Sequence, residues 1–110
     1  MKKINLAITG CMGRMGKQII KSAHSNKNFK IIALTESKKI NRKINGVKIT
    51  LNTEQTFKNT NIIIDFTIPK CTLQVLDIAS RLKKRVVIGT TGFTKKEENK
   101  IKEFSKKIPI

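Results

Sequence analysis

The sequence contains no tryptophan or tyrosine, one histidine and two cysteines. Its five phenylalanines are too few to interleave with basic residues as a base-stacking surface requires. Cys11 and Cys71 lie far apart and show no metal-type spacing, so we expect neither a metal site nor a disulfide. No apolar run approaches the roughly 20 residues that a membrane span needs. These absences favour a cytoplasmic protein with an aliphatic core.

Acidic residues are also scarce: 7 Asp and Glu stand against 24 Lys and Arg, which gives a formal net charge of +17. Such a charge can indicate a nucleic-acid or anionic-membrane partner. Here the basic residues are spread over every segment and are mostly lysine rather than arginine. We interpret them as a solvated surface, and we expect no membrane partner, no specific nucleic acid and only weak binding to polyanions.

Strand-like and helix-like segments alternate along the 110 residues, which suffice for one domain. This alternation is typical of a parallel sheet with helical crossovers, and it predicts an α/β, Rossmann-like, doubly wound domain. Asn45 and Gly46 predict a tight turn, and Thr94 with Glu97 predicts a capping box at a helix start. The expected strands are 3–9, 30–36, 47–51, 61–66 and 85–89, the expected helices are 14–25, 69–82 and 95–106, a helical turn is expected at 54–58, and 107–110 resemble the start of another strand.

Three glycines, Gly10, Gly13 and Gly16, lie between an apolar strand and an amphipathic helix. A strand that breaks at glycine and continues as a helix leaves unpaired N–H groups at the positive end of the helix dipole, where a phosphate binds favourably. Met12 takes the place of the second glycine of the common dinucleotide pattern. A purely structural turn is the alternative, but the flanking strand and helix favour a pyrophosphate site.

Glu36 ends the second expected strand, where a carboxylate can accept hydrogen bonds from the ribose hydroxyls of adenosine. An ordinary exposed acid is the alternative. Two more hydroxyl-rich segments, 65–69 and 89–93, also follow expected strands, at the edge where doubly wound sheets bind ligands. The small hydroxyl residues of these segments would let a flat ring approach the backbone, and their hydroxyls would give hydrogen bonds to a carboxamide. The alternative is that both segments are merely tight connections between strand and helix.

Together these segments resemble the amino-terminal, cofactor-binding part of the 4-hydroxy-tetrahydrodipicolinate reductase (dihydrodipicolinate reductase) family of diaminopimelate–lysine biosynthesis. The resemblance spans essentially the whole chain and implies an NAD- or NADP-dependent oxidoreductase that reduces a cyclic imine dicarboxylate, as a homo-oligomer when complete. It rests on the run from Gly10 to Gly16, on Asp65-Phe66-Thr67 with Pro69, and on Gly89-Thr90-Thr91-Gly92-Phe93. The implied cofactor-binding residues are Gly10, Cys11, Met12, Gly13, Arg14 and Met15 at the pyrophosphate and ribose, Glu36 at the adenosine ribose, and Gly89, Thr90 and Thr91 at the nicotinamide.

The sequence departs from this family in two ways. Ser37 stands where the family often carries a basic residue for a 2′-phosphate, and Lys38 and Lys39 are interpreted as a solvated connection. Because Glu36 also repels a 2′-phosphate, we expect NADH to bind at least as well as NADPH. Residues 1–110 would form a dinucleotide-binding domain truncated before the substrate-binding domain, so we assign no catalytic residue and expect no turnover by this chain alone. A stand-alone dinucleotide-binding module, or a charge-driven nucleic-acid binder, is the alternative.

Further expectations concern single side chains. We interpret His24 as structural, Met15 as packed under the glycine loop and Arg14 as able to reach the pyrophosphate. The helix terminus could lower the pKa of Cys11, although an incidental small residue is the preferred interpretation. We also expect exposed apolar surface near residues 108 and 110, and an uncovered sheet edge.

Overall fold

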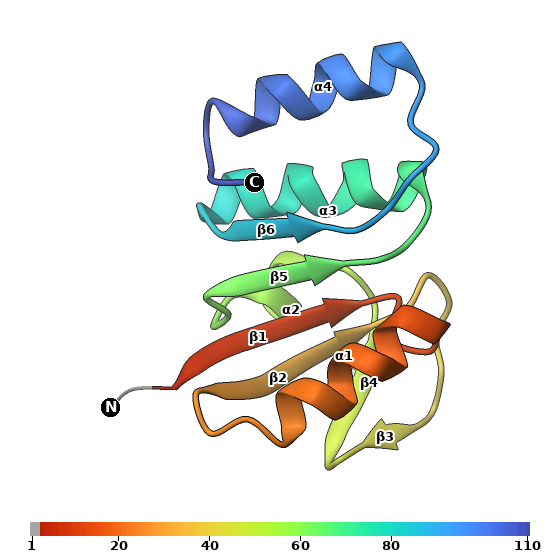
Figure 1. The fold of residues 1–110 in the computed structure, drawn as a ribbon, viewed down its shortest axis with the longest axis vertical. Helices are drawn as coiled ribbons and strands as arrows, with labels where there is room; N and C mark the ends of the chain where they lie inside the picture. The colour runs from red at the N-terminus through yellow and green to blue at the C-terminus, as the bar shows by residue number, and fades with distance from the viewer. Residues whose placement is uncertain (1–2) are drawn as a thin grey trace.

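The computed structural model describes residues 3–110, which form one six-stranded sheet with helices on both faces (Figure 1). The strands are β1 (Ile4–Thr9), β2 (Phe29–Thr35), β3 (Lys43–Ile44), β4 (Val47–Thr50), β5 (Ile62–Asp65) and β6 (Arg85–Ile88), and the helices are α1 (Arg14–His24), α2 (Glu54–Phe57), α3 (Pro69–Leu82) and α4 (Lys95–Ser105). The strand order is β3-β4-β2-β1-β5-β6, and every neighbouring pair is parallel except β3 and β4. The expected Rossmann-like, mainly parallel α/β fold is confirmed.

The antiparallel β3–β4 hairpin forms one edge of the sheet, and its first strand, β3, was not predicted from the sequence. Asn45 and Gly46 form its turn with φ values of 50° and 83°, the positive values that a two-residue hairpin turn requires. The predicted turn is therefore confirmed. The sequence signal did not reveal β3, because its two residues, Lys43 and Ile44, are too few to show an alternating pattern.

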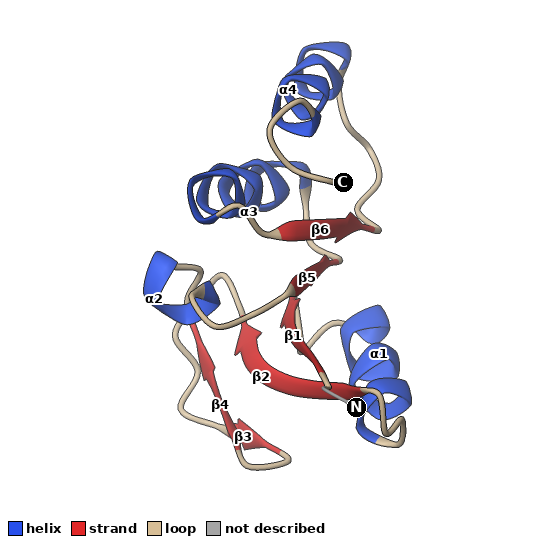
Figure 2. Ribbon diagram, turned by 90° about the vertical axis from the view of Figure 1, so that its left-hand side faces the viewer, coloured by secondary structure: helices blue, strands red, loops and turns tan. Residues whose placement is uncertain are grey.

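The two faces of the sheet are covered unequally. Figure 2 shows α1 on one side of the sheet and α2 and α3 on the other, and α4 packs against α3. The buried core on the α3 side consists of Ala7, Ala33, Phe57, Ile63, Val75, Leu76, Ile78, Ala79, Val86 and Ile108. The smaller core on the α1 side consists of Ile8, Cys11, Ile20, Leu34 and Ile49.

On the α1 side, the part of the sheet formed by β5 and β6 carries no helix among residues 3–110. Helix α1 packs over β1 and β2, so Ile62 and Ile64 stay half-buried and Val87 is 53 % exposed. The strand expected at 61–66 is confirmed as β5, but only Ile63 and Asp65 of its four residues are buried. Met15 is 48 % exposed and lines an apolar groove beside these residues, so the expectation that it packs under the glycine loop is wrong.

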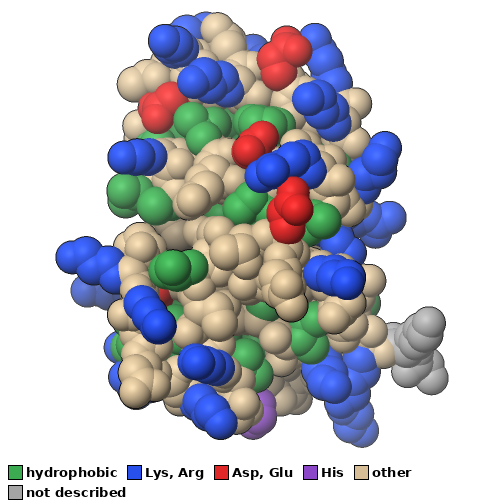
Figure 3. Space-filling model, turned by 180° about the vertical axis from the view of Figure 1, so that it is seen from behind, with side chains coloured by type: hydrophobic (Ala, Val, Ile, Leu, Met, Phe, Trp, Pro, Cys, Tyr) green, Lys and Arg blue, Asp and Glu red, His purple; other side chains and the backbone are tan. Residues whose placement is uncertain are grey.

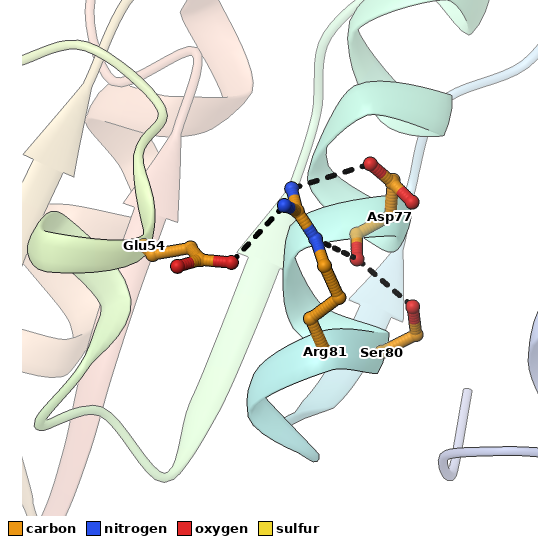
Figure 4. Close-up of polar contacts among 4 residues, drawn as sticks. All are labelled: Glu54, Asp77, Ser80 and Arg81. Atoms are coloured by element: carbon orange, nitrogen blue, oxygen red, sulfur yellow. Dashed lines mark hydrogen bonds and ion pairs between the residues drawn. The ribbon is translucent and has the colours of Figure 1, made fainter.

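An exposed ion-pair group joins α2 to α3. Arg81 on α3 contacts the carboxylate of Glu54 on α2 at 3.1 Å and that of Asp77, one turn earlier on α3, at 3.3 Å (Figure 4). The Ser80 hydroxyl donates to the Asp77 carbonyl at 2.8 Å (Figure 4). Because all three charged side chains are more than half exposed, each pair stabilises the fold by less than about 1 kcal/mol.

The chain after α4 folds back onto the sheet. Turn hydrogen bonds from the amides of Lys107 and Ile108 to the Phe104 carbonyl bring Ile108 into the α3-side core, where it is 3 % exposed. The expectation of exposed apolar surface is therefore wrong for Ile108, although Ile110 is 43 % exposed. Residues 107–110 form no strand, yet the Pro109 carbonyl accepts a hydrogen bond from Val86 of β6 at 3.1 Å, so the edge is not left fully uncovered as expected.

Candidate functional site

The glycine loop between β1 and α1 is shaped by close backbone packing. Gly10 has a φ of +64°, and a Cβ there would lie 2.3 Å from the Phe66 carbonyl oxygen. A Cβ on Gly16, in the first turn of α1, would lie 2.3 Å from the Gly10 carbonyl oxygen. Gly13 is less confined, since its Cβ would meet the same oxygen at 3.3 Å. Gly10 and Gly16 thus let the helix start directly against the strand end, as a dinucleotide-binding turn requires.

The amides of this loop are used in two different ways. Within the loop, the amide of Cys11 donates to the Thr35 carbonyl at 3.2 Å and that of Gly13 to the Gly10 carbonyl at 3.0 Å. In contrast, the amides of Arg14, Met15 and Gly16 donate to no acceptor in residues 3–110, and Gly13 supplies no side-chain cap. The free donors therefore belong to the first turn of α1, at the positive end of its dipole.

Glu36 follows β2 and reaches over to this loop. Its Oε2 accepts a hydrogen bond from the Met12 amide at 2.7 Å, while Oε1 has no partner in the described part of the chain. The half-buried carboxylate thus lies directly beside the glycine loop with one acceptor oxygen available. Sequence reasoning placed both elements at one edge of the sheet, and the structure brings them into contact.

A cleft of about 500 Å³ opens beside the loop and Glu36. Gly10, Met12 and Gly13 line it from the loop. Its further lining residues are the polar Glu36, Ser37, Asn52 and Thr67 and the apolar Phe66, Ile68 and Cys71. Among the expected site residues, Arg14 and Met15 are exposed but lie outside this lining. The cleft therefore combines a bare backbone, an acid and a small apolar wall, which suits a nucleotide.

Cys11 lies in the loop but is fully buried. Burial, with a further contribution from the negative charge of Glu36, raises the pKa of its thiol from the ordinary 9.0 to about 11. The alternative of a pKa lowered by the helix terminus is therefore wrong. Cys11 is therefore a small packing residue, as preferred on sequence grounds. Its backbone amide donates to the Thr35 carbonyl, while its sulfur is buried in the core.

Asp65, at the end of β5, is the most enclosed acid of the described chain. It is fully buried, and no Lys, Arg or His within residues 3–110 pairs with it. Instead its carboxylate accepts hydrogen bonds from four threonine hydroxyls. The donors are Thr9 on β1, Thr67 after β5 at 3.0 Å, Thr72 on α3 and Thr90 after β6 at 3.1 Å. Sequence reasoning noted Asp65 as part of a motif but missed this cluster; its only signal was threonine recurring at strand ends and in the first turn of α3.

The segment after β6 carries the remaining expected site residues. A Cβ on Gly89 would lie 1.8 Å from the Phe66 ring, so this glycine makes room for that ring. The Thr90 hydroxyl donates to Asp65 and accepts from the Thr67 amide at 2.8 Å, so its side chain is engaged within the protein. Thr91 is exposed. Gly89, Thr90 and Thr91 do not line the 500 Å³ cleft. Gly89 and Thr90 instead contact two residues that do line it, Phe66 and Thr67.

Other kinds of site find little support in residues 3–110. No group of three potential metal-ligating side chains occurs there, and Cys11 and Cys71 are both free thiols. No helix in this range is long and apolar enough to span a membrane. Figure 3 shows Lys and Arg side chains spread over the whole of the face it presents, with no single basic patch.

Comparison with known proteins gives a consistent result. Residues 4–110 match the family described as dihydrodipicolinate reductase, N-terminus. The chain is 70 % identical over 110 residues to a 4-hydroxy-tetrahydrodipicolinate reductase of Pelagibacter ubique (strain HTCC1062), covering all of this chain and 43 % of that protein. It is 38 % identical over 123 residues to the reductase of the same name from Buchnera aphidicola subsp. Baizongia pistaciae (strain Bp), covering all of this chain and 45 % of that protein.

The fold agrees with that of a solved structure. A dipicolinate-bound dihydrodipicolinate reductase from Paenisporosarcina sp. TG-14 superposes with a TM-score of 0.78 at 24 % identity, over 94 % of this chain and 43 % of that one. The chain thus spans less than half the length of the relatives that it matches. By its sequence and its glycine-loop architecture, the chain belongs to the dihydrodipicolinate reductase amino-terminal family.

Proposed function

We propose that this chain binds a nicotinamide dinucleotide, with the pyrophosphate at the first turn of α1 and the adenosine ribose at Glu36. One observation carries the proposal. The amides of Arg14, Met15 and Gly16 have no acceptor in residues 3–110, and the loop that precedes them holds Glu36 by a 2.7 Å hydrogen bond from the Met12 amide to Oε2, which leaves Oε1 free. Phosphate requires donors, and the ribose hydroxyls require an acceptor. The residues present therefore fit the cofactor.

We place the expected contacts accordingly. The backbone of Gly10, Cys11, Met12, Gly13, Arg14 and Met15 faces the pyrophosphate and its ribose, Glu36 the adenosine ribose, and Gly89, Thr90 and Thr91 the nicotinamide. Because the Thr90 hydroxyl is held by Asp65 and Thr67, the contact from Thr90 comes from its backbone. Gly16 joins this set through its free amide.

The activity of the whole protein is proposed from its relatives. Both curated relatives are named 4-hydroxy-tetrahydrodipicolinate reductases, so we assign this chain to the cofactor-binding half of an enzyme that reduces that cyclic imine in lysine biosynthesis. The bound nicotinamide supplies the hydride, while the residues described here bind and orient it. We assign substrate binding to the part of the relatives that this chain does not match, and we expect no turnover from these 110 residues alone.

In this proposal NADH serves at least as well as NADPH. The acid at Glu36 repels a 2′-phosphate, and Ser37 offers no positive charge to offset that repulsion. Lys38 and Lys39 are exposed and do not line the cleft. We therefore expect NADH to bind at least as tightly as NADPH.

Titration of the chain with NADH and NADPH, followed by nicotinamide fluorescence, tests the proposal. Glu36→Gln keeps the size of the side chain and can still accept from Met12, but it replaces a charged acceptor, so NADH affinity falls about tenfold. The matched control, Glu98→Gln on the exposed face of α4, leaves both affinities unchanged. The proposal is overturned if the chain binds neither cofactor or if Glu36→Gln binds NADH as tightly as the unaltered chain does. A strong preference for NADPH contradicts the expected cofactor choice.

A further inference from the structure

One polar atom of the cleft lacks a partner. The Oδ1 of Asn52 is buried and accepts no hydrogen bond from any residue in the described range 3–110. Asn52 follows β4 and lines the same cleft as Glu36 and Ser37. Because buried polar atoms of native proteins are nearly always paired, an unpaired amide that borders a ligand cleft points to a ligand.

Asn52 and Glu36 are held next to each other by the sheet. The Glu36 amide donates to the Thr50 carbonyl at 3.0 Å, which ties the end of β2 to the end of β4. Glu36, Ser37 and Asn52 all line the same cleft. A ribose at Glu36 has its base one glycosidic bond away, inside the cleft that Asn52 also lines.

The remaining lining suits a flat ring. Phe66, Ile68 and Cys71 supply apolar side chains, and Ile68 is 60 % exposed although it borders the cleft. A heterocycle placed against these side chains buries its faces and turns an edge toward the amide. On the adenine edge, the 6-amino group is a donor and N7 is an acceptor, which matches the acceptor and donor of an asparagine amide.

We propose that Asn52 is a specificity-determining residue that reads the adenine of the dinucleotide. When the cofactor binds, the Asn52 amide turns its buried Oδ1 into the cleft, where the 6-amino group donates to it while Nδ2 donates to N7, so the unpaired oxygen gains a partner. This assignment rests on the proposed function, which places the adenosine ribose at Glu36. It adds recognition of the base to the recognition of ribose and pyrophosphate.

A cofactor analogue tests this assignment without altering the protein. Reduced nicotinamide hypoxanthine dinucleotide differs from NADH by a carbonyl oxygen in place of the 6-amino group. Calorimetric titration of the unaltered chain with both compounds gives an affinity about tenfold lower for the analogue, because the amide then faces an acceptor instead of a donor. In Asn52→Ala the affinity for NADH falls about tenfold and the difference between the two compounds disappears. The control Asn99→Ala, on the exposed face of α4, keeps both the affinity for NADH and the difference between the two compounds.

The outcomes separate this assignment from the proposed function. Equal affinity of the unaltered chain for NADH and the analogue overturns the role of Asn52 but leaves dinucleotide binding intact. Retained discrimination in Asn52→Ala overturns it as well. Binding of neither compound overturns the proposed function itself. If Asn52→Ala fails to fold, the comparison of the two compounds on the unaltered chain still decides.

Discussion

The strand–helix junctions after β1 and after β5 lie side by side at one edge of the sheet, and they are built in opposite ways. The first, Gly10–Gly13, uses backbone and leaves the first-turn amides of α1 unpaired. The second begins with Asp65, whose carboxylate gathers four hydroxyls, and its helix starts at Pro69, which has no amide to offer. The first junction therefore offers the amides of Arg14, Met15 and Gly16 to a ligand. The second pairs its acid within the protein and leaves the first-turn amides of Lys70 and Cys71 without an acceptor in residues 3–110.

These two roles, ligand binding at the first junction and internal pairing of an acid at the second, explain why the junctions need different residues. An anion site requires donors that the protein has not already used, and small residues that let the anion approach. A buried acid at the edge of a cleft has the opposite requirement, because its carboxylate needs hydrogen-bond partners from the protein itself. The Thr67 amide, bonded to Thr90, and the Phe66 ring, seated on Gly89, fix the second junction as one wall of the cleft.

The largest expected effect tests the internal pairing of the second junction. Asp65→Ala leaves four threonine hydroxyls without their shared acceptor, and we expect the free energy of unfolding to fall by about 3 kcal/mol in urea denaturation. The control Asp77→Ala removes an acid that is 62 % exposed, with an expected loss below about 1 kcal/mol. Equal losses for the two variants would show that the threonine cluster contributes nothing special.

A matched pair of alanine substitutions tests the packing of the first junction. Gly16→Ala forces its Cβ onto backbone at 2.3 Å, and we expect a loss of about 2 kcal/mol. Gly13→Ala meets the nearest atom at 3.3 Å without a positive φ, and the expected change is within about 1 kcal/mol. Urea midpoints of the two variants measure the difference. If Gly13→Ala proves the more destabilising, the loop is not packed as described.

The smallest effect concerns the thiol beneath the first junction. With a pKa of about 11 instead of 9.0, Cys11 carries roughly a hundredth of the ordinary thiolate at pH 8. Iodoacetamide should therefore modify the half-buried Cys71 long before Cys11, as peptide mass mapping would show. Since the unfolded thiol ionises first, Cys11 also lowers stability as the pH rises above about 9, and Cys11→Ser removes this contribution. Modification of both thiols at one rate would mean that the loop opens readily.

Much of this arrangement could be predicted from the sequence, because the signals are local. The glycines, the apolar strands, the Asn45-Gly46 turn and the capping box of Thr94 and Glu97 each depend on a few neighbouring residues, and the structure confirms them. Parallel strands ending at one edge brought Glu36 to the side of the glycine loop, but its hydrogen bond with the Met12 amide was not predicted.

The remainder depends on contacts between distant segments. Met15 was expected to be buried because its side chain is apolar. Its exposure depends on α1 leaving β5 and β6 uncovered, which no local pattern in the sequence indicates. The burial of Ile108 needs the turn after α4, and the four partners of Asp65 come from four separate segments. Asn52 has no neighbours in sequence that distinguish it from any polar loop residue, and only the folded cleft reveals it.

The hydrogen bond between Pro109 and Val86 bears on how separate copies of the chain behave in concentrated solution. Sheets polymerise when a foreign strand finds unused amides along an outer strand. At one margin of this sheet the outer strand, β3, has only two residues, and at the other a proline carbonyl already occupies the amide of Val86. Strand-by-strand growth at β6 would first have to displace the segment 107–110, together with the buried Ile108 that anchors it.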